Sequence, residues 1–212
     1  MGRAATNAKR ASLVAVPKTL TRRIIGLTGG IATGKSTVSD YLVSRYALPV
    51  LDADVYSRLA VEKGSDVLNS ITERYGSNIL LPDKTLNRAA LGQIIFNDSE
   101  EKRWVEQQIH PFVRNKFDEV TKSFPTEQTL IYSIPLLFEA NLTHLVSEIW
   151  VVYCSPAQQK VRLMARNQLS AEDAQARIDA QMSLEEKCDR AHYTLDNSKT
   201  QQHLFAQVDA VL

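Results

Sequence analysis

Residues 23–38, RIIGLTGGIATGKSTV, decide the fold of this chain. They begin with a short apolar run from Ile24 to Leu27, which is typical of a buried strand. A loop containing glycines follows, and an amphipathic helix then opens at Lys35. The loop fits the pattern G-x-x-x-x-G-K-[ST], whose fixed positions are Gly29, Gly34, Lys35 and Ser36. Because strand, loop and helix come in the required order, the stretch predicts a phosphate-binding loop.

Each residue type in this loop suits the binding of a polyphosphate. Glycine lets the chain turn tightly, so several backbone N–H groups can point inward. The helix N-terminus adds free N–H groups and the positive end of its dipole. Lys35 supplies a charge for the β- and γ-phosphates, and the Ser36 hydroxyl suits a Mg²⁺ ligand. The residues predicted to contact the nucleotide are Gly29, Gly30, Ala32, Thr33, Gly34, Lys35, Ser36 and Thr37.

The composition limits the other possibilities. A chain of 212 residues suits one α/β domain with an inserted module. Its 25 basic and 24 acidic residues nearly balance, which gives no sign of a nucleic-acid or membrane partner. Cys154 and Cys188 form no disulfide framework or metal cluster, and no apolar run approaches membrane-spanning length. We expect a soluble, cytoplasmic protein that is a monomer or a weak homo-oligomer.

The first 22 residues form a basic segment without an acid, since the first acid of the chain is Asp40. We interpret the segment as a disordered basic tail, because it has no long amphipathic pattern. Two alternatives stay open. Its Ala, Ser and Thr content fits an organelle transit peptide, and Gly2 with Thr6 fits a myristoylation pattern.

Two carboxylates close the second predicted strand, residues 49–54. Strands of an open α/β sheet present ligands at their carboxyl ends, so Asp52 or Asp54 should lie near the phosphate loop. One can orient an acceptor hydroxyl or take its proton, and the other can reach magnesium. We favour Asp54 as the catalytic residue, with an N-cap role as its alternative. Arg58, one turn later, is placed to orient Asp54 or to touch substrate phosphate.

Residues 64–123 are predicted to be helical throughout, which favours an inserted module for the second substrate. Asp98 should cap one helix with Glu101 as its capping-box partner. Pro111 should kink or break that helix and bias His110 out of the α region. Each candidate substrate contact is as easily a solvated surface charge; the candidates are Lys84, Arg88, His110 and Arg114.

Residues 115–118, NKFD, match the guanine-reading motif of GTPases. That motif belongs at the end of an apolar strand, whereas this copy lies in a helical pattern. We therefore reject guanine recognition.

A third strand is predicted at residues 129–134, followed by Pro135 and Glu139. No Asp ends this strand, which leaves Asp54 and Ser36 as the magnesium-side candidates. Glu139 faces the acceptor site or occupies a first helical turn. After a fourth strand at residues 148–154, Arg162 and Arg166 lie four apart on one helix face. They suit a clamp on the transferring phosphoryl group, with surface charges as the alternative.

Two capping boxes begin at Ser170 and Ser183 and predict a helix, a break and a second helix, which favours a mobile lid. Its polar candidates are Arg177, Gln181 and Lys187. A short fifth strand at residues 191–197 and a closing helix from Thr200 complete the chain.

Taken together, these motifs resemble the dephospho-CoA kinase family. The resemblance covers residues 23–212 and includes the phosphate loop, Asp52-Ala-Asp54, His110-Pro111, residues 135–139, and Gln159 with Arg162 and Arg166. It implies ATP- and Mg²⁺-dependent phosphorylation of the ribose 3′-hydroxyl of dephospho-CoA, the last step of coenzyme A synthesis. Asp54 matches the family's base, the two arginines match its lid-side clamp, and Asn197 matches the neighbourhood of the adenine.

The fold expected is an α/β P-loop kinase with a five-stranded parallel sheet flanked by helices. Residues 23–63, 124–167 and 191–212 should form the nucleotide-binding core, residues 64–123 the helical CoA-binding module, and residues 168–190 the lid.

The sequence departs from the family at Ala32, where glycine is usual, and we expect little effect. The family's Ala-Asp before the fifth strand is Ala191-His192 here, and its Gly after the Asn is Ser198; these departures concern the adenine contact. Two other readings are open: a P-loop kinase acting on another nucleotide or nucleoside, and a non-catalytic nucleotide switch or adaptor.

Overall fold

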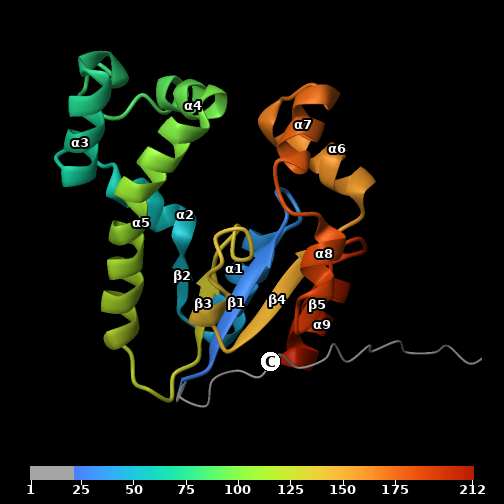
Figure 1. The fold of residues 1–212 in the computed structure, drawn as a ribbon. Helices are drawn as coiled ribbons and strands as arrows, with labels where there is room; N and C mark the ends of the chain where they lie inside the picture. The colour runs from blue at the N-terminus through green and yellow to red at the C-terminus, as the bar shows by residue number, and fades with distance from the viewer. Residues whose placement is uncertain (1–21) are drawn as a thin grey trace, which may run out of the picture. The chain divides into compact units, whose positions relative to one another are not determined.

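The computed structural model describes residues 22–212 (Figure 1). The predicted basic tail, apart from Arg22, lies outside these residues. The described chain divides into two compact units. The first comprises the residues up to Leu51 together with Thr126–Leu212, and the second is Asp52–Pro125. No helix in residues 22–212 is long and apolar enough to cross a membrane.

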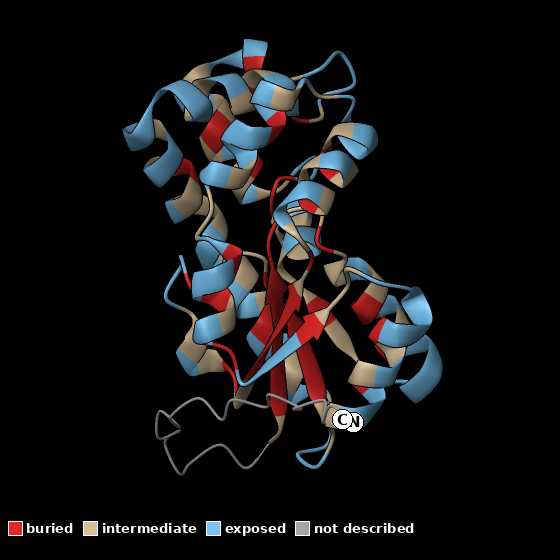
Figure 2. Ribbon diagram, turned by 90° about the vertical axis from the view of Figure 1, so that its right-hand side faces the viewer, coloured by how far each residue is buried: buried red, intermediate tan, exposed pale blue. Residues whose placement is uncertain are grey.

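A five-stranded sheet forms the centre of the first unit, in the order β2-β3-β1-β4-β5. Its pairs β1–β3, β1–β4 and β4–β5 are parallel. All residues of β1 and β3 are buried, as expected for parallel strands covered on both faces, and Figure 2 shows this buried centre. The predicted parallel sheet is therefore confirmed. The strands are β1 Ile24–Gly29, β2 Val50–Asp52, β3 Leu130–Ser133, β4 Glu148–Tyr153 and β5 Tyr193–Asp196.

Helices α1 and α9 pack together against this sheet. Leu42 of α1 and Leu204 of α9 lie in one apolar cluster with the buried Trp150 of β4. The Tyr41 ring stacks on Phe205 with ring centroids 3.8 Å apart, which fixes the closing helix predicted from Thr200. The helices of this unit are α1 Lys35–Tyr46, η2 Thr143–Leu145, α6 Pro156–Asn167, α7 Ala171–Asp179, α8 Leu184–Asp189 and α9 Gln201–Val211.

The segment predicted as a lid does contain a helix, a break and a second helix. The Ser170 hydroxyl accepts from the backbone N–H of Asp173, and Ser183 does the same for Glu186. These caps are the reason that α7 and α8 begin where they do. Each helix has one fully buried residue, Ala174 in α7 and Lys187 in α8. Lys187 therefore anchors α8, and movement of this segment as a lid stays a prediction.

The second unit is helical and has its own apolar core, which includes Leu68, Ile71 and Val105. The prediction of helices throughout is wrong at one point, since Leu80 and Leu86 form an isolated antiparallel bridge. The helices are α2 Ala53–Ala60, α3 Asp66–Tyr75, η1 Ser77–Ile79, α4 Arg88–Asn97 and α5 Ser99–Lys122. The unit begins at Asp52, not at residue 64 as expected.

Helix α5 runs through Pro111 without ending, so the predicted break is wrong and His110 is helical, while the alternative of a kink stays a prediction. A proline removes one N–H donor from the helix ladder. Val105 and Phe117 are buried on either side of it, and their packing holds both halves of the helix in place.

Asp98 caps α5 as predicted, since its carboxylate accepts from the N–H groups of Glu100 and Glu101. The Glu101 side chain, however, is not a capping-box partner. It accepts from Arg74 Nε and Nη2, both at 2.7 Å, and from the Tyr75 hydroxyl at 2.5 Å. Hydrogen bonds from Arg74 and then Tyr75 lower the pKa of Glu101 to about 2. This contact fastens α3 to α5.

Candidate active site

The phosphate loop connects β1 and α1 as predicted, with Gly29 ending the strand and Lys35 starting the helix. Gly34 has a φ of 104°, and a Cβ there would lie 2.1 Å from Asn197 Nδ2. Only glycine meets both conditions. Ala32 has a φ of 62°, so this departure from the family falls at a left-handed position, where alanine costs about 1 kcal/mol.

Lys35 reaches from the start of α1 to the end of β3, where its Nζ donates to the Ser133 hydroxyl. The contact follows from the register, because β3 lies next to β1 and Ser133 pairs with Leu27. The sequence offered no acidic residue at this strand end. The fully buried Ser133 hydroxyl stands there. Sequence reasoning missed this residue, although it lies near the end of the predicted third strand.

Three side-chain amides hold the main chain of the loop. Gln181 Oε1 accepts from the Ile31 N–H at 2.8 Å, and Gln159 Nε2 donates to the Ile31 carbonyl at 2.9 Å. Asn197 Nδ2 donates to the Thr33 carbonyl at 2.8 Å. Asn197 was predicted near the adenine, and the structure places it on the loop. Gln159 was noted only as part of a motif.

The two arginines predicted as a phosphate clamp have different surroundings. Arg162 Nη2 donates to the Asn197 carbonyl at 2.9 Å. Because the Asn197 side chain donates to the Thr33 carbonyl, Arg162 is connected to the loop through Asn197. Arg166 is exposed and donates to the neighbouring Asn167 side chain at 2.8 Å. Their contact with phosphate stays a prediction.

Glu139 lies in a run of turns and not in a helix, so the reading of a first helical turn is wrong. Its Oε1 pairs with Lys187 Nζ at 2.7 Å and accepts from the Met182 N–H at 3.1 Å. Lys187 also donates to the Pro135 carbonyl at 3.2 Å. Glu139 thereby fastens the start of α8 to the chain after β3. Its predicted contact with the acceptor stays a prediction.

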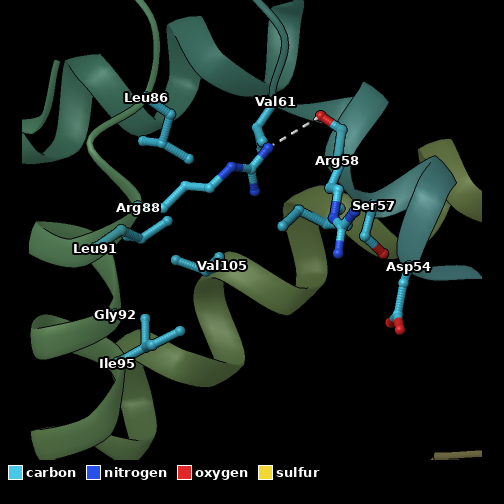
Figure 3. A pocket seen from close by; sticks show the side chains of 11 residues that line it. Asp54, Ser57, Arg58, Val61, Leu86, Arg88, Leu91, Gly92, Ile95 and Val105 are labelled. Carbon is cyan, nitrogen blue, oxygen red and sulfur yellow. Dashed lines mark hydrogen bonds between the residues drawn. The ribbon is translucent and has the colours of Figure 1, made fainter. Parts of the chain in front are cut away.

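A pocket of about 450 Å³ lies in the second unit (Figure 3). It brings together three of the predicted substrate residues, Asp54, Arg58 and Arg88. Arg88 Nη2 donates to the Arg58 carbonyl at 3.5 Å. Lys84 and His110 are exposed residues of the same unit that do not line it. The other lining residues are Ser57, Val61, Leu86, Leu91, Gly92, Ile95, Val105 and Ile109, most of them apolar.

The two acidic residues at the end of β2 and the start of α2 have distinct positions. Asp52 is the N-cap of α2, and its Oδ1 accepts from the N–H groups of Asp54 at 2.8 Å and Val55 at 3.3 Å. The prediction that Asp54 could cap the helix is therefore wrong. Asp54 lies in the first turn, exposed and at the pocket. Capping by Asp52 fixes the direction in which α2 leaves the strand and so places Asp54.

Ser36 is exposed in the first turn of α1, next to the phosphate loop, so its hydroxyl is available as a ligand for a magnesium ion. Residues 22–212 contain no group of three or more His, Cys, Asp or Glu side chains suited to a metal. Magnesium bound with nucleotide does not need such a group, because it takes one or two protein ligands and completes its shell with phosphate and water.

Comparison with known proteins adds independent findings. The family model for dephospho-CoA kinase matches residues 23–203. The dephospho-CoA kinase of Trichormus variabilis is 53% identical over 193 residues, which cover 91% of this chain and 98% of the relative. That of Synechocystis is 56% identical over 177 residues, covering 84% and 88%.

Two solved structures agree with the fold. A crystal structure from Thermus thermophilus has a TM-score of 0.78 and 33% identity, and covers 90% of this chain and 96% of its own. A dephospho-CoA kinase from Campylobacter jejuni has a TM-score of 0.63 and 28% identity, covering 89% and 96%. With a family model that matches most of its length and relatives that share half of its residues, the chain belongs to the dephospho-CoA kinase family.

Proposed function

We propose that this chain transfers the γ-phosphoryl group of ATP to the ribose 3′-hydroxyl of dephospho-CoA, giving coenzyme A and ADP. The proposed acceptor is supported by the pocket lined by Asp54, Arg58 and Arg88, whose other lining residues are mostly apolar. Dephospho-CoA combines a ribose hydroxyl, a diphosphate and a largely apolar pantetheine arm. One carboxylate, two guanidiniums and an apolar wall correspond to these three parts.

On the donor side, the loop and α1 bind the triphosphate. The N–H groups of the first helical turn have no partner within the helix and can therefore serve phosphate oxygens. Lys35 adds a positive charge beside the β- and γ-phosphates. Ser36 would hold magnesium, which when bound neutralises phosphate charge. Arg162 and Arg166 are proposed to contact the transferring group from the lid side.

On the acceptor side, Arg58 and Arg88 are proposed to bind the diphosphate, while Leu86, Leu91 and Ile95 contact the pantetheine arm. Arginine suits a diphosphate because its planar fork donates to two oxygens at once. Lys84, His110 and Glu139 are further proposed contacts. Asp54 orients the 3′-hydroxyl.

In the transfer step the 3′-oxygen forms a bond to the γ-phosphorus, and the bond from that phosphorus to the β–γ bridging oxygen breaks. ADP leaves with the electron pair of the broken bond. The hydroxyl proton is lost late in a loose transition state, and Asp54 can accept it. Positioning of the 3′-oxygen is therefore the larger part of the task of Asp54.

The test is incubation of the purified protein with Mg-ATP and dephospho-CoA, with mass spectrometry of the product. We expect a product heavier by one phosphate. Coenzyme A is the matched control acceptor, because its 3′-position already carries a phosphate, and it should give no product. Turnover of a nucleoside or nucleotide with none of dephospho-CoA would favour another P-loop kinase. Mg-ATP binding without turnover of any acceptor would favour a switch.

The acceptor pocket has its own test in two arginine variants. Arg88→Ala should raise KM for dephospho-CoA by about 10- to 100-fold, the usual worth of hydrogen bonds to a charged group. Arg103→Ala is the matched control, since Arg103 is exposed in the same unit and does not line the pocket. Equal KM values for both variants would remove Arg88 from the diphosphate site.

A further inference from the structure

We propose that Gln159 and Gln181 are positioning residues that set the orientation of the peptide groups in the phosphate loop, and that Gln181 does so from an anchored segment next to the lid. The inference rests on the proposed use of ATP, because oriented N–H groups in the loop serve to bind a ligand that carries phosphate. It assigns a task in phosphate binding to two side chains that touch the loop and not the phosphate.

The geometry at Ile31 is the first step. Its N–H donates to Gln181 Oε1 at 2.8 Å, and its carbonyl accepts from Gln159 Nε2 at 2.9 Å. These bonds lie on two consecutive peptide groups, one before and one after the Ile31 Cα. Both backbone groups of this residue are therefore taken by side chains from outside the loop.

Peptide planarity carries the effect into the loop. In a trans peptide the carbonyl and the N–H point in opposite directions. A carbonyl of Ile31 held toward Gln159 turns the Ala32 N–H away from Gln159. On the preceding peptide, an N–H held by Gln181 turns the Gly30 carbonyl the other way. The Gly30 carbonyl then accepts from the N–H of Thr33 at 3.3 Å and from the Thr33 hydroxyl at 2.9 Å. Gln181 therefore braces the turn from Gly30 to Thr33.

A third amide repeats the arrangement two residues later. Asn197 Nδ2 donates to the Thr33 carbonyl at 2.8 Å, which turns the Gly34 N–H in the opposite direction. Gln159 and Asn197 thus hold alternate carbonyls, and the N–H groups of Ala32 and Gly34 face away from them. Such a run of oriented N–H groups is how a loop forms a concave site for an anion.

The support of Gln181 is itself fixed. The next residue, Met182, donates its N–H to Glu139, which pairs with the fully buried Lys187. Lys187 and the Thr28 hydroxyl both donate to the Pro135 carbonyl, at 3.2 and 3.0 Å. The segment that carries Gln181 is therefore tied to the chain after β3 and, through Thr28, to β1.

The two glutamines use opposite ends of their amides, and this makes the proposal testable. Ile31 N–H can only donate and its carbonyl can only accept, so Gln181 needs its oxygen and Gln159 its nitrogen. Gln181→Glu keeps the acceptor for Ile31, whereas Gln181→Met removes it. Gln159→Met removes the donor to the carbonyl. Gln175→Met is the matched control, because Gln175 lies on α7 and its amide contacts Asp179 instead of the loop.

The experiment measures Mg-ATP affinity by calorimetry, KM for each substrate, and the amide signal of Ile31 in protein labelled with ¹⁵N-isoleucine. Ile31→Val identifies that signal by its loss. We expect Gln181→Met and Gln159→Met each to weaken Mg-ATP binding about tenfold, as for a lost hydrogen bond, and to raise KM for ATP. KM for dephospho-CoA should not change. The Ile31 amide should exchange faster in Gln181→Met and stay protected in Gln181→Glu.

Parent-like ATP affinity in Gln181→Met, with faster exchange at Ile31, would overturn the proposal, because the loop would then bind phosphate without its brace. A fall in kcat with both KM values unchanged would also overturn it, since loss of folded protein has that effect. If Gln159→Met does not fold, the half-buried Gln181 decides alone. Failure of the parent to phosphorylate dephospho-CoA would reject the proposed function, while Mg-ATP binding and the Ile31 signal would still decide this inference.

Discussion

The ion pair between the buried Lys187 and the partly exposed Glu139 gives a prediction in which two substitutions together destabilise the protein less than one of them alone. The Lys187 side chain is 0% exposed and the Glu139 side chain 22%, with 2.7 Å between Nζ and Oε1. Glu139→Gln removes the negative charge and leaves a buried ammonium without its counter-charge. We expect this to lower the free energy of unfolding by about 3 kcal/mol, the lower end for a broken buried pair, because the amide oxygen still accepts.

Lys187→Met should cost much less, about 1 kcal/mol, because methionine fills similar volume and no buried group is stranded. Glu139 still accepts from the Met182 N–H and reaches water, and the Pro135 carbonyl keeps its bond from Thr28 at 3.0 Å. The double variant has no buried charge either. It should therefore be more stable than Glu139→Gln alone, by about 2 kcal/mol on the same reasoning.

Urea unfolding of the four proteins measures this order through the midpoint and slope. Glu119→Gln is the control, since its pair with Lys116 lies at the surface at 2.8 Å and should contribute less than about 1 kcal/mol. A double variant less stable than Glu139→Gln, so that the two costs simply add, would refute the reasoning. The segment carrying Gln181 would then be held by apolar packing and not by this pair.

Four further predictions concern single residues. Lys35→Ala should keep the fold and lower kcat by on the order of 10²- to 10³-fold, and full turnover would exclude its role at the phosphates. If orientation dominates, Asp54→Asn should turn over dephospho-CoA clearly faster than Asp54→Ala, and parent rates in both would leave Asp54 without a catalytic part. Ala32→Gly should raise the free energy of unfolding by about 1 kcal/mol in urea, because φ is 62° there, and no gain would mean that the loop relaxes around alanine. The pKa of Glu101 is lowered to about 2, so its contribution to stability is complete above its ordinary pKa of 4.5 and is lost as pH falls from there toward 2. The difference in Tm between parent and Glu101→Gln should therefore shrink as pH falls from 4.5 toward 2, and a constant difference would contradict this role.

Features that depend on near neighbours were predictable from the sequence. The phosphate loop, the serine caps at Ser170 and Ser183, and the cap at Asp98 each involve residues within a few positions of one another. The buried strands followed from their apolar runs. Residues 115–118 lie within α5, as their helical pattern predicted.

Features that depend on distant partners were not predictable. Ile31 and Gln181 are 150 residues apart, and Lys35 and Ser133 are 98 apart. No spacing rule connects such residues. The continuation of α5 through Pro111 was not predictable either, since burial of Val105 and Phe117 outweighs the local penalty of a proline. The Glu101 side chain accepts from Arg74, which lies 27 residues away, instead of making the predicted capping contact near Asp98.

The continuous segment Asp52–Pro125 carries every residue that lines the acceptor pocket, including Asp54. The phosphate loop and the amides that hold it lie outside this segment. If the proposed roles hold, recombination at its two ends would exchange this pocket together with Asp54 in one step and leave the phosphate loop unchanged. In such a hybrid protein, the residues that would bind a new acceptor and the carboxylate that would orient its hydroxyl come from the same parent, so the two need not evolve separately.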